Sequence, residues 1–498
     1  MTLPIDIEVF IPEGIDSAPD PLSKGEHDLI NRLLLKLRRD QKALSKYNDY
    51  YEGTQRLENL GIAIPPELEA FVVMVNWPRI VADSLEHRID LEGFRLPGQL
   101  KRDENLWRVW QANNMDEESQ AAHLDAIVLK RSYVCVGTDE DDPRTPLVTV
   151  ESPLEMTHEI DRRTRKVRAA LRYYRETDED GLQVDRVTLY LKDQTLWAEK
   201  RWTGTDRGWV ITDRDFHELG RVPVVPLINR TRVSDRDGVS ELADVITLTD
   251  AAARALTLAQ LATETLSVPQ KVMLGATAED FIDPATNKVV PKWEAYFGSV
   301  WALENEKARP FQFSPADLAN FDKIVSLYAA QVSSITGLPL RFFGQNTANP
   351  PSADGIRADE SRLIKAAERR HRAWGGAWEE VARLIKLFQD GEIPDNWVEL
   401  EAIWRNPATP TQAETADATV KLVTANVLPV EAAWEEMGYS QTKITQLREL
   451  REKQLADTDL LARSVASFRS PGETQDASDD PSGSPDTAAS SEAVLAVS

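Results

Sequence analysis

Cysteine is scarce in this sequence, and long apolar runs are missing. Cys135 is the only cysteine in 498 residues, so no internal disulfide can form, which fits a reducing cytoplasm. Catalysis by this thiol would need a partner histidine, and none is recognisable nearby, so packing is its expected role. No stretch approaches the roughly 20 apolar residues of a membrane span. The first residues lack the basic start and apolar core of a signal peptide, so we expect no membrane partner.

The motifs of common enzyme classes are missing as well. No glycine-rich loop followed by Lys-Ser/Thr occurs, which argues against an ATP-driven motor. The six histidines are scattered, and the sequence has no metal-type histidine pair, no cysteine cluster and no Gly-x-Ser-x-Gly elbow. The sequence therefore predicts a protein that is not an enzyme, with no catalytic residue, no metal and no cofactor. A cytosolic enzyme with an unrecognised site stays open as an alternative.

An excess of positive charge is absent too. The chain has 58 basic and 82 acidic side chains, which give a formal charge of −24. Phosphate contacts supply most of the affinity of nucleic-acid-binding proteins, so such proteins usually carry a basic excess. This chain therefore either ignores nucleic acid or handles it without tight binding.

Two basic clusters nevertheless stand out. The first comprises Arg162, Arg163, Arg165, Lys166 and Arg168. It is either a nucleic-acid patch or, as the composition favours, an exposed hairpin among acidic neighbours. The second lies between residues 357 and 372, where glutamates interleave with the arginines, so pairing within or between subunits is expected.

The composition supports a sizeable core, because hydrophobic residues make up 42% and charged residues 28% of the chain. Its length suggests about three structural units. Near the N-terminus, apolar residues at helical spacing predict helices over about 26–51, 67–90 and 104–131. Pro78 interrupts the second of these, since proline fits the first turn of a helix and not its interior.

The middle of the chain changes to a strand pattern. Between about 132 and 230, short alternating runs separated by turn signals predict an antiparallel meander. The segment 220–230 contains Pro223 and Pro226, so it is extended and hardly a central strand.

Long helices dominate the following part. Residues 239–266 contain neither glycine nor proline, and they are rich in alanine and poor in large apolar residues. Such a helix has too little bulk for a strong core of its own, so we expect close packing against identical or similar helices. After a strand-like stretch over 267–313, Ser314-Pro315-Ala316-Asp317 predicts the start of a helix that runs to about Thr336.

A further long helix is predicted over about 355–390. It contains Gly375 and Gly376, and each glycine costs about 1 kcal/mol relative to alanine inside a helix. The pair predicts a kink or very close packing of another backbone. Residues 411–468 read as more helices, with Gly438 near the break before the last one. The composition of 470–498 predicts disorder.

The order of several short segments resembles a known family. The segments are Tyr50-Tyr51-Glu52-Gly53, Asn76 to Asp83, Gly93-Phe94, Leu219 to Arg230, Ile335 to Pro339 and Asn349 to Ala353. Together, over about 26–465, they resemble the portal, or head-to-tail connector, proteins of tailed bacteriophages, especially the branch found in phages of actinobacteria. No single segment is decisive, but their order and spacing are specific.

The resemblance implies an α+β portal fold, with a mixed wing domain, long stem helices, a small α/β clip and a helical crown. Mapped onto this sequence, it implies an N-terminal arm over 1–25, a wing of helices plus meander over 26–236, a stem helix over 237–266, a clip over 267–313, a second stem helix over 314–337, a channel loop over 338–354, a kinked helix and wing return over 355–410, a helical crown over 411–469 and a disordered tail over 470–498.

The resemblance also implies a function. A ring, expected to be a dodecamer, would form at one capsid vertex and serve as the conduit for packaging and ejection of double-stranded DNA. Its expected partners are the terminase large subunit, the major capsid and scaffolding proteins and the head-tail adaptor protein, with DNA passing through without tight binding. The expected location is the virion, after assembly in the host cytoplasm. The rival within phages is another minor head or adaptor protein.

Three groups of candidate residues follow. The channel loop offers Arg341, Gln345, Asn346 and Asn349, which could touch DNA phosphates in passing; Arg341 could equally pair with an acidic residue of the next subunit. Trp293, Tyr296 and Trp301 are candidate terminase contacts in the clip, although each could instead be a core or subunit contact. Gly375 and Gly376 mark the helix kink.

Overall fold

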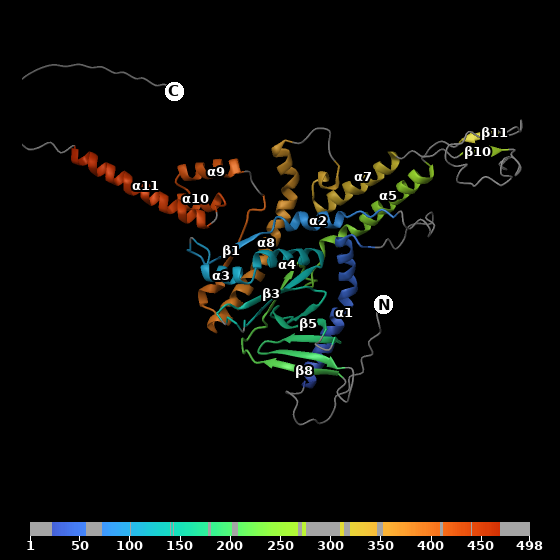
Figure 1. The fold of residues 1–498 in the computed structure, drawn as a ribbon, viewed down its shortest axis with the longest axis horizontal. Coiled ribbons are helices and arrows are strands. Elements are labelled where there is room, and N and C mark those ends of the chain that lie inside the picture. Colours follow the sequence, from blue (N-terminus) through green and yellow to red (C-terminus); the bar gives the residue numbers. More distant parts are fainter. Residues whose placement is uncertain are drawn as a thin grey trace, which may run out of the picture. The chain divides into compact units, whose positions relative to one another are not determined.

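The computed structural model describes residues 22–55, 72–99, 101–139, 141–142, 144–177, 181–201, 208–266, 271–274, 309–312, 319–345, 352–408, 412–439 and 441–468. Helices and sheets are mixed, so the fold is α+β, as expected (Figure 1). The chain divides into two compact units, Met1–Thr409 and Pro410–Ser498.

Helix α1, Lys24–Glu52, confirms the first predicted helix. It begins with a capping box, in which Ser23 accepts from the Glu26 N–H and the Glu26 carboxylate accepts from the Ser23 N–H. It ends at Gly53, whose φ of 75° is the left-handed conformation that glycine adopts without strain. Its apolar stripe is buried.

The next two predicted helices are shorter or divided. Helix α2 spans Trp77–Glu86, with Pro78 in its first turn, and the described residues 72–76 before it are not helical. The prediction over 67–90 was therefore too long. The stretch over 104–131 forms two helices, α3, Glu104–Ala112, and α4, Met115–Val128. Asn114 between them has a φ of 53°, which ends one helix before the other begins.

The strand region forms two sheets. In the first, β2, Arg131–Gly137, lies between β3, Leu147–Glu151, and β9, Val224–Ile228, all antiparallel. The proline-containing strand β9 is thus at an edge, which confirms that it is not a central strand.

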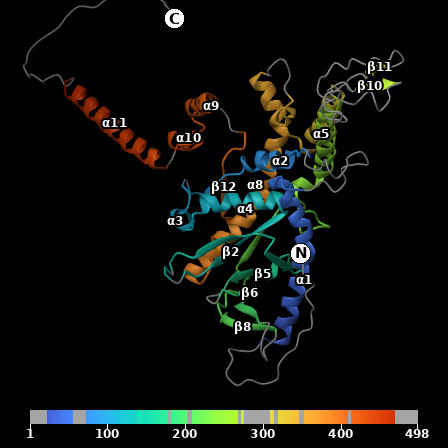
Figure 2. The same cartoon turned by 45° about the vertical axis from the view of Figure 1, so that its right-hand side comes forward.

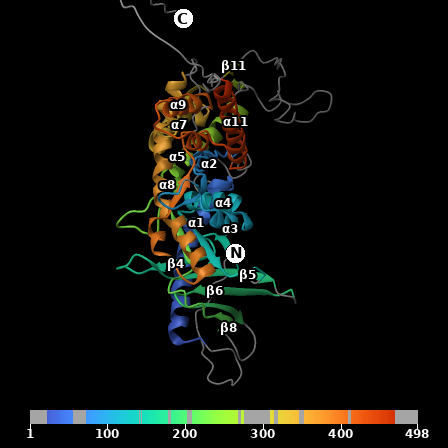
Figure 3. The same cartoon turned by 90° about the vertical axis from the view of Figure 1, so that its left-hand side faces the viewer.

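The second sheet is the predicted meander. Its five strands, in order, are β4, Met156–Ile160, β5, Val167–Thr177, β6, Gln183–Tyr190, β7, Thr195–Arg201, and β8, Gly208–Asp215. Helix α1 runs alongside this sheet (Figures 2 and 3). Ile30 and Leu33 of α1 share a buried core with Leu171 and Leu189 of the sheet, so the N-terminal helix and the meander fold together.

The two long helices after the sheets lie side by side. Helix α5, Ile246–Leu266, follows a 3-10 turn, η2, Glu241–Asp244, and α7 spans Ala319–Thr336 (Figure 1). Between them in sequence, β10, Lys271–Leu274, pairs antiparallel with β11, Arg309–Gln312. The predicted helix start at Ser314 and most of the strand-like stretch lie outside the described residues.

Helix α8, Ala353–Asp390, passes through the largest core of the first unit, where Trp374 and Trp378 are fully buried. A short turn, η4, Leu340–Phe343, precedes it, and η5, Asp395–Glu399, follows it. The chain then forms β12, Glu401–Trp404, which pairs antiparallel with β1, Leu91–Arg95. This pairing was not predicted.

The described residues of the second unit form three helices, α9, Gln412–Thr424, α10, Val430–Glu436, and α11, Gln441–Phe468. They confirm the predicted helical character of 411–468, and Gly438, with a φ of 73°, follows α10. The predicted arm up to residue 21 and the predicted disordered tail lie outside the described residues.

Candidate functional site

The predicted channel loop begins with a tightly held turn. Pro339 precedes η4 and Gly344 ends it in the left-handed conformation, with a φ of 79°. Just before the turn, Gly337 ends α7, and a Cβ there would lie 3.0 Å from the Arg362 side chain of α8. Arg362 in turn donates to the Ser334 carbonyl of α7 at 3.0 Å. The end of α7 is therefore fixed against α8.

Arg341 pairs with carboxylates of its own chain. Its guanidinium contacts Glu360 on α8 and lies 3.5 Å from Asp359. The other oxygen of Glu360 accepts from Arg88, after α2, at 2.7 Å. Arg88 also donates to the Pro407 carbonyl at 2.6 Å. One carboxylate thus joins three segments, and the pairing that the sequence allowed between subunits has a partner within the subunit.

The other predicted loop residues are placed only in part. The side-chain oxygen of Gln345 accepts from the Ser326 hydroxyl of α7 at 3.0 Å, so this amide faces the helix that precedes the loop. Asn346 and Asn349 lie outside the described residues, as do the clip candidates Trp293, Tyr296 and Trp301.

The paired glycines lie in an α8 that runs unbroken from residue 353 to 390. A Cβ on Gly375 would lie 3.4 Å from the indole nitrogen of Trp404 on β12, whereas nothing lies within 4 Å of one on Gly376. The close neighbour is thus a side chain and not a backbone. Gly375 leaves room for β12, while the predicted kink itself stays a prediction.

A cluster of tryptophans and histidines surrounds this part of α8. The Trp378 indole donates to His123 of α4 at 2.9 Å, and the His123 ring stacks on Trp374 at 5.1 Å between centroids. The ring of His371 stacks on Trp404 in the same way, at 4.7 Å. Complete burial lowers the pKa of His123 to about 3, so it is a neutral acceptor. Sequence reasoning missed this cluster because its members are far apart along the chain.

A buried ionic network links α1 to the two sheets, and it too was missed. Arg131 of β2 is fully buried and contacts Asp40 of α1 at 2.8 Å. Lys130 lies 3.3 Å from the same carboxylate, and Lys36 lies 3.0 Å from Asp237. Although burial opposes ionisation of Asp40, Arg131 and Lys130 hold its pKa below the usual value. The network fixes α1 against the strands.

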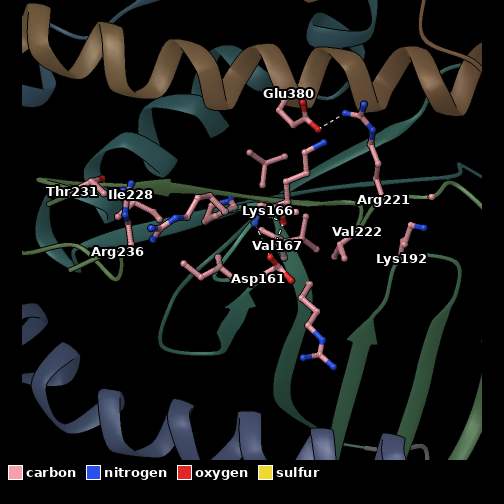
Figure 4. A pocket seen from close by; sticks show the side chains of 18 residues that line it. Asp161, Lys166, Val167, Lys192, Arg221, Val222, Ile228, Thr231, Arg236 and Glu380 are labelled. Atoms are coloured by element: carbon pink, nitrogen blue, oxygen red, sulfur yellow. Dashed lines mark hydrogen bonds and ion pairs between the residues drawn. The ribbon is translucent and has the colours of Figure 1, made fainter. Parts of the chain in front are cut away.

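Two adjoining hollows flank the turn between β4 and β5, where the first basic cluster lies. The larger, of about 820 Å³, lies between this turn, β9 and α8 (Figure 4). The smaller, of about 570 Å³, opens toward α1. They share Ile160, Arg165 and Arg236 in their linings. The basic cluster thus lies in a concave region that sequence alone could not show.

Most of the charges that line the larger hollow are positive. Arg221 pairs with Glu380 of α8 at 2.6 Å, and Glu380 is the only glutamate among the described residues that line this hollow (Figure 4). Asp161 accepts backbone N–H groups of Arg163 and Thr164, and these hydrogen bonds lower its pKa. Among the described residues, Arg165, Lys166 and Lys192 have no carboxylate within 4 Å.

The described residues indicate neither a membrane-spanning helix nor a metal site. None of their helices combines the length and the apolar character that a membrane crossing requires. Within the same part of the chain, no group of three or more His, Cys, Asp or Glu side chains is placed to hold a metal ion.

Sequence comparison identifies the family of this chain. Residues 32–457 match the family described as "Phage portal protein, SPP1 Gp6-like", and the chain belongs to this family.

Two curated relatives support the assignment. The portal protein of Mycobacterium phage D29 is 39% identical over 424 residues, which cover 83% of this chain and 86% of the relative. The portal protein of Mycobacterium phage L5 is 38% identical over 426 residues, with the same two coverages. This chain is thus a bacteriophage portal protein, and the resemblance to portals of actinobacterial phages is confirmed. The family is one of structural proteins.

Proposed function

We propose that this chain forms a closed ring, expected to be a dodecamer, at one capsid vertex, with the α5–α7 pair as its stem. Family membership implies ring assembly in general. The observation that carries the proposal for this chain is the surface of α7, which has a second apolar face that stays exposed among the described residues.

The two faces of α7 differ in what covers them. Ala329 and Val332 are completely buried and pack in the main core of the unit. Ile324, Leu327 and Ile335 are 41%, 57% and 48% exposed, and their spacing places them along one stripe of the helix. Exposed apolar stripes on a helix mark interaction surfaces, and a neighbouring copy of α5 or α7 would cover this one.

The small residues of α5 suit the same arrangement. Ala252, Ala253 and Ala255 are buried. The Thr257 hydroxyl donates to the Ala253 carbonyl of the same helix, and the Thr249 hydroxyl donates to the carbonyl of Val245, just before the helix. A helix with this composition can approach its neighbours closely but adds little apolar area by itself. Its stability therefore depends on packing partners, of which α7 is one and a second subunit is the proposed other.

In this proposal, the α1–β9 region together with β12 belongs to the wing, and β10 and β11 belong to the clip. Residues 411–469 form the crown. The ring guides double-stranded DNA during packaging and ejection, and the clip docks the terminase large subunit and later the head-tail adaptor protein. The capsid and scaffolding proteins surround the wing. Pull-down of terminase by rings carrying Trp293→Ala, Tyr296→Ala or Trp301→Ala tests the clip: intact rings that lose terminase support it, and unimpaired binding places the motor elsewhere.

The channel loop is proposed to contact DNA in passing. Because Glu360 holds Arg341, the arginine orients the start of the loop, and the amides Asn346 and Asn349 supply weak contacts without charge. Replacing Arg341, Asn346 and Asn349 together by alanine should leave rings and procapsids intact but reduce the number of completely filled heads. Wild-type packaging and genome retention in this variant would remove the functional role of the loop.

A further inference from the structure

The two hollows beside the β4–β5 turn collect positive charge in a chain whose net charge is strongly negative. Counted together, their linings contain nine basic and three acidic side chains. The basic residues are Arg32, Lys36, Arg162, Arg165, Lys166, Arg168, Lys192, Arg221 and Arg236. They come from α1, the β4–β5 turn, the start of β5, the β6–β7 connection and the segments on either side of β9. Residues distant in sequence thus converge on one basic surface.

Several of these cations have no internal partner. In the part of the chain that the structure describes, Arg162, Arg165, Lys166 and Lys192 have no carboxylate within 4 Å, and all four are exposed. The Nε–H of Arg236, which lines both hollows, is buried and has no acceptor among the described residues.

The fold fixes the backbone at the positions that carry these cations. In the turn, the Asp161 N–H donates to the Lys166 carbonyl at 2.9 Å, and Arg165 has a φ of 64°. Near Arg236, the left-handed Gly238 has no room for a Cβ, which would lie 2.6 Å from the Lys130 carbonyl. The cations are therefore displayed on a preformed surface.

The chemistry of the surface indicates which anion it fits. Four of the nine basic groups are already paired: Arg32 and Arg168 with Glu159, Lys36 with Asp237, and Arg221 with Glu380. The other five are spread over two adjoining hollows, and a polymer with a charge on each unit can engage more of them at once than a single small anion can. Six of the nine are arginines, whose planar fork matches phosphate oxygens. No Phe, Tyr or Trp appears among the described lining residues, so the surface offers no platform for stacked bases.

The geometry points to a phosphate-binding surface for the backbone of double-stranded DNA, separate from the channel loop. This inference goes beyond the proposed function, and depends on it only for the choice of DNA as the polyanion. It assigns the basic cluster to nucleic acid, because the neighbours that the fold brings to it are mainly basic. Contacts to phosphates alone are independent of sequence and weaken as salt increases, so the surface would steady DNA without holding it fast.

The test uses full-length protein and a fluorescein-labelled 24-base-pair duplex. The variant carries Arg165→Asn, Lys166→Gln and Lys192→Gln; asparagine is chosen at 165 because it tolerates the left-handed backbone. The control carries Lys24→Gln, Lys42→Gln and Lys453→Gln, which remove the same charge at exposed positions outside both hollows. Oligomer mass is measured for all three proteins, and affinity is measured by anisotropy from 50 to 200 mM salt.

We expect the hollow variant to bind the duplex about tenfold more weakly at 50 mM salt. The slope of log affinity against log salt concentration should also be smaller in magnitude by about 2 to 3, because each phosphate contact contributes about 0.9 to that slope. The control should match the wild type. Equal affinities of hollow variant and control would overturn the inference. Two competition results would also overturn it. One is stronger competition by polyglutamate than by unlabelled duplex of equal charge, which would assign the surface to an acidic protein segment. The other is full displacement of the labelled duplex by inorganic phosphate at constant ionic strength. If the wild-type protein forms no ring, that result would instead refute the proposed function.

Discussion

At the scale of single residues, one carboxylate connects three distant parts of the portal. Glu360 is only 16% exposed in its side chain and contacts both Arg341 and Arg88. Replacing it by glutamine leaves two arginines without their shared anion.

Glu360→Gln should therefore lower the free energy of unfolding by about 1–3 kcal/mol, the usual cost of breaking a partly buried, charge-assisted contact. Asp359→Asn is the matched control, since Asp359 is 58% exposed and lies farther from Arg341, so its loss should cost less than about 1 kcal/mol. Thermal unfolding of both variants measures the difference. Equal effects would show that Glu360 has no special role in the junction.

The buried histidine cluster predicts how stability responds to acid. His123 is neutral in the folded chain because burial lowers its pKa to about 3, whereas it titrates near 6.5 when unfolded. Between these values the unfolded state binds the additional proton, so stability decreases as pH decreases, by about 1.4 kcal/mol per pH unit well below 6.5. His158, whose pKa burial also lowers to about 3, adds to the effect.

His123→Gln tests this account directly, because glutamine can still accept from the Trp378 indole but does not titrate. Urea unfolding from pH 7.5 to 4.5 should give a shallower pH dependence for the variant than for the wild type, with both measured in the same buffers. Parallel pH profiles would contradict the assignment of His123 as a neutral, buried base.

At the scale of elements, local patterns predicted more than distant pairings. The helix over about 26–51, the proline-limited edge strand β9 and the helix over about 355–390 were predictable because each depends on neighbouring residues. The pairing of β1 with β12 was not, because it joins segments about 300 residues apart whose short runs resemble loops. The break at Asn114 was missed because a single left-handed residue leaves little trace in an apolar pattern.

The candidate sites show the same limit. The run of five basic residues was evident in sequence, but its interpretation depended on neighbours from α1, β9 and α8 that only the fold brings together. Likewise, the sequence identified Arg341 as the one cation of the loop, but it did not show that Glu360 of α8 pairs with it. The sequence shows which residues are charged, but it does not show which of them form ion pairs in the fold.

The exposed stripe of α7 gives a prediction at this scale. Leu327→Lys should leave the fold of the subunit intact, because the side chain is 57% exposed, but should disrupt the ring by placing a charge in the proposed interface. Leu182→Lys, at a 64% exposed leucine in the β5–β6 connection, is the matched control and should assemble normally. Sizing by light scattering distinguishes them, and assembly of both variants would place the subunit contact elsewhere.

At the scale of the whole molecule, the account depends on assembly. A net charge of −24 makes subunits repel one another, so ring formation requires the apolar face of α7 and the small residues of α5 to outweigh that repulsion. The same negative background suits a conduit, because DNA that meets few cations can slide. The basic hollows are proposed as one surface that contacts its phosphates.

The mass of the purified full-length protein in solution is the most direct measurement. Native mass spectrometry, with end-on electron microscopy of the same sample, should show a closed ring with an open centre and a mass about twelve times that of the 55.9 kDa chain. A particle of 55.9 kDa that persists at all concentrations would contradict the central claim.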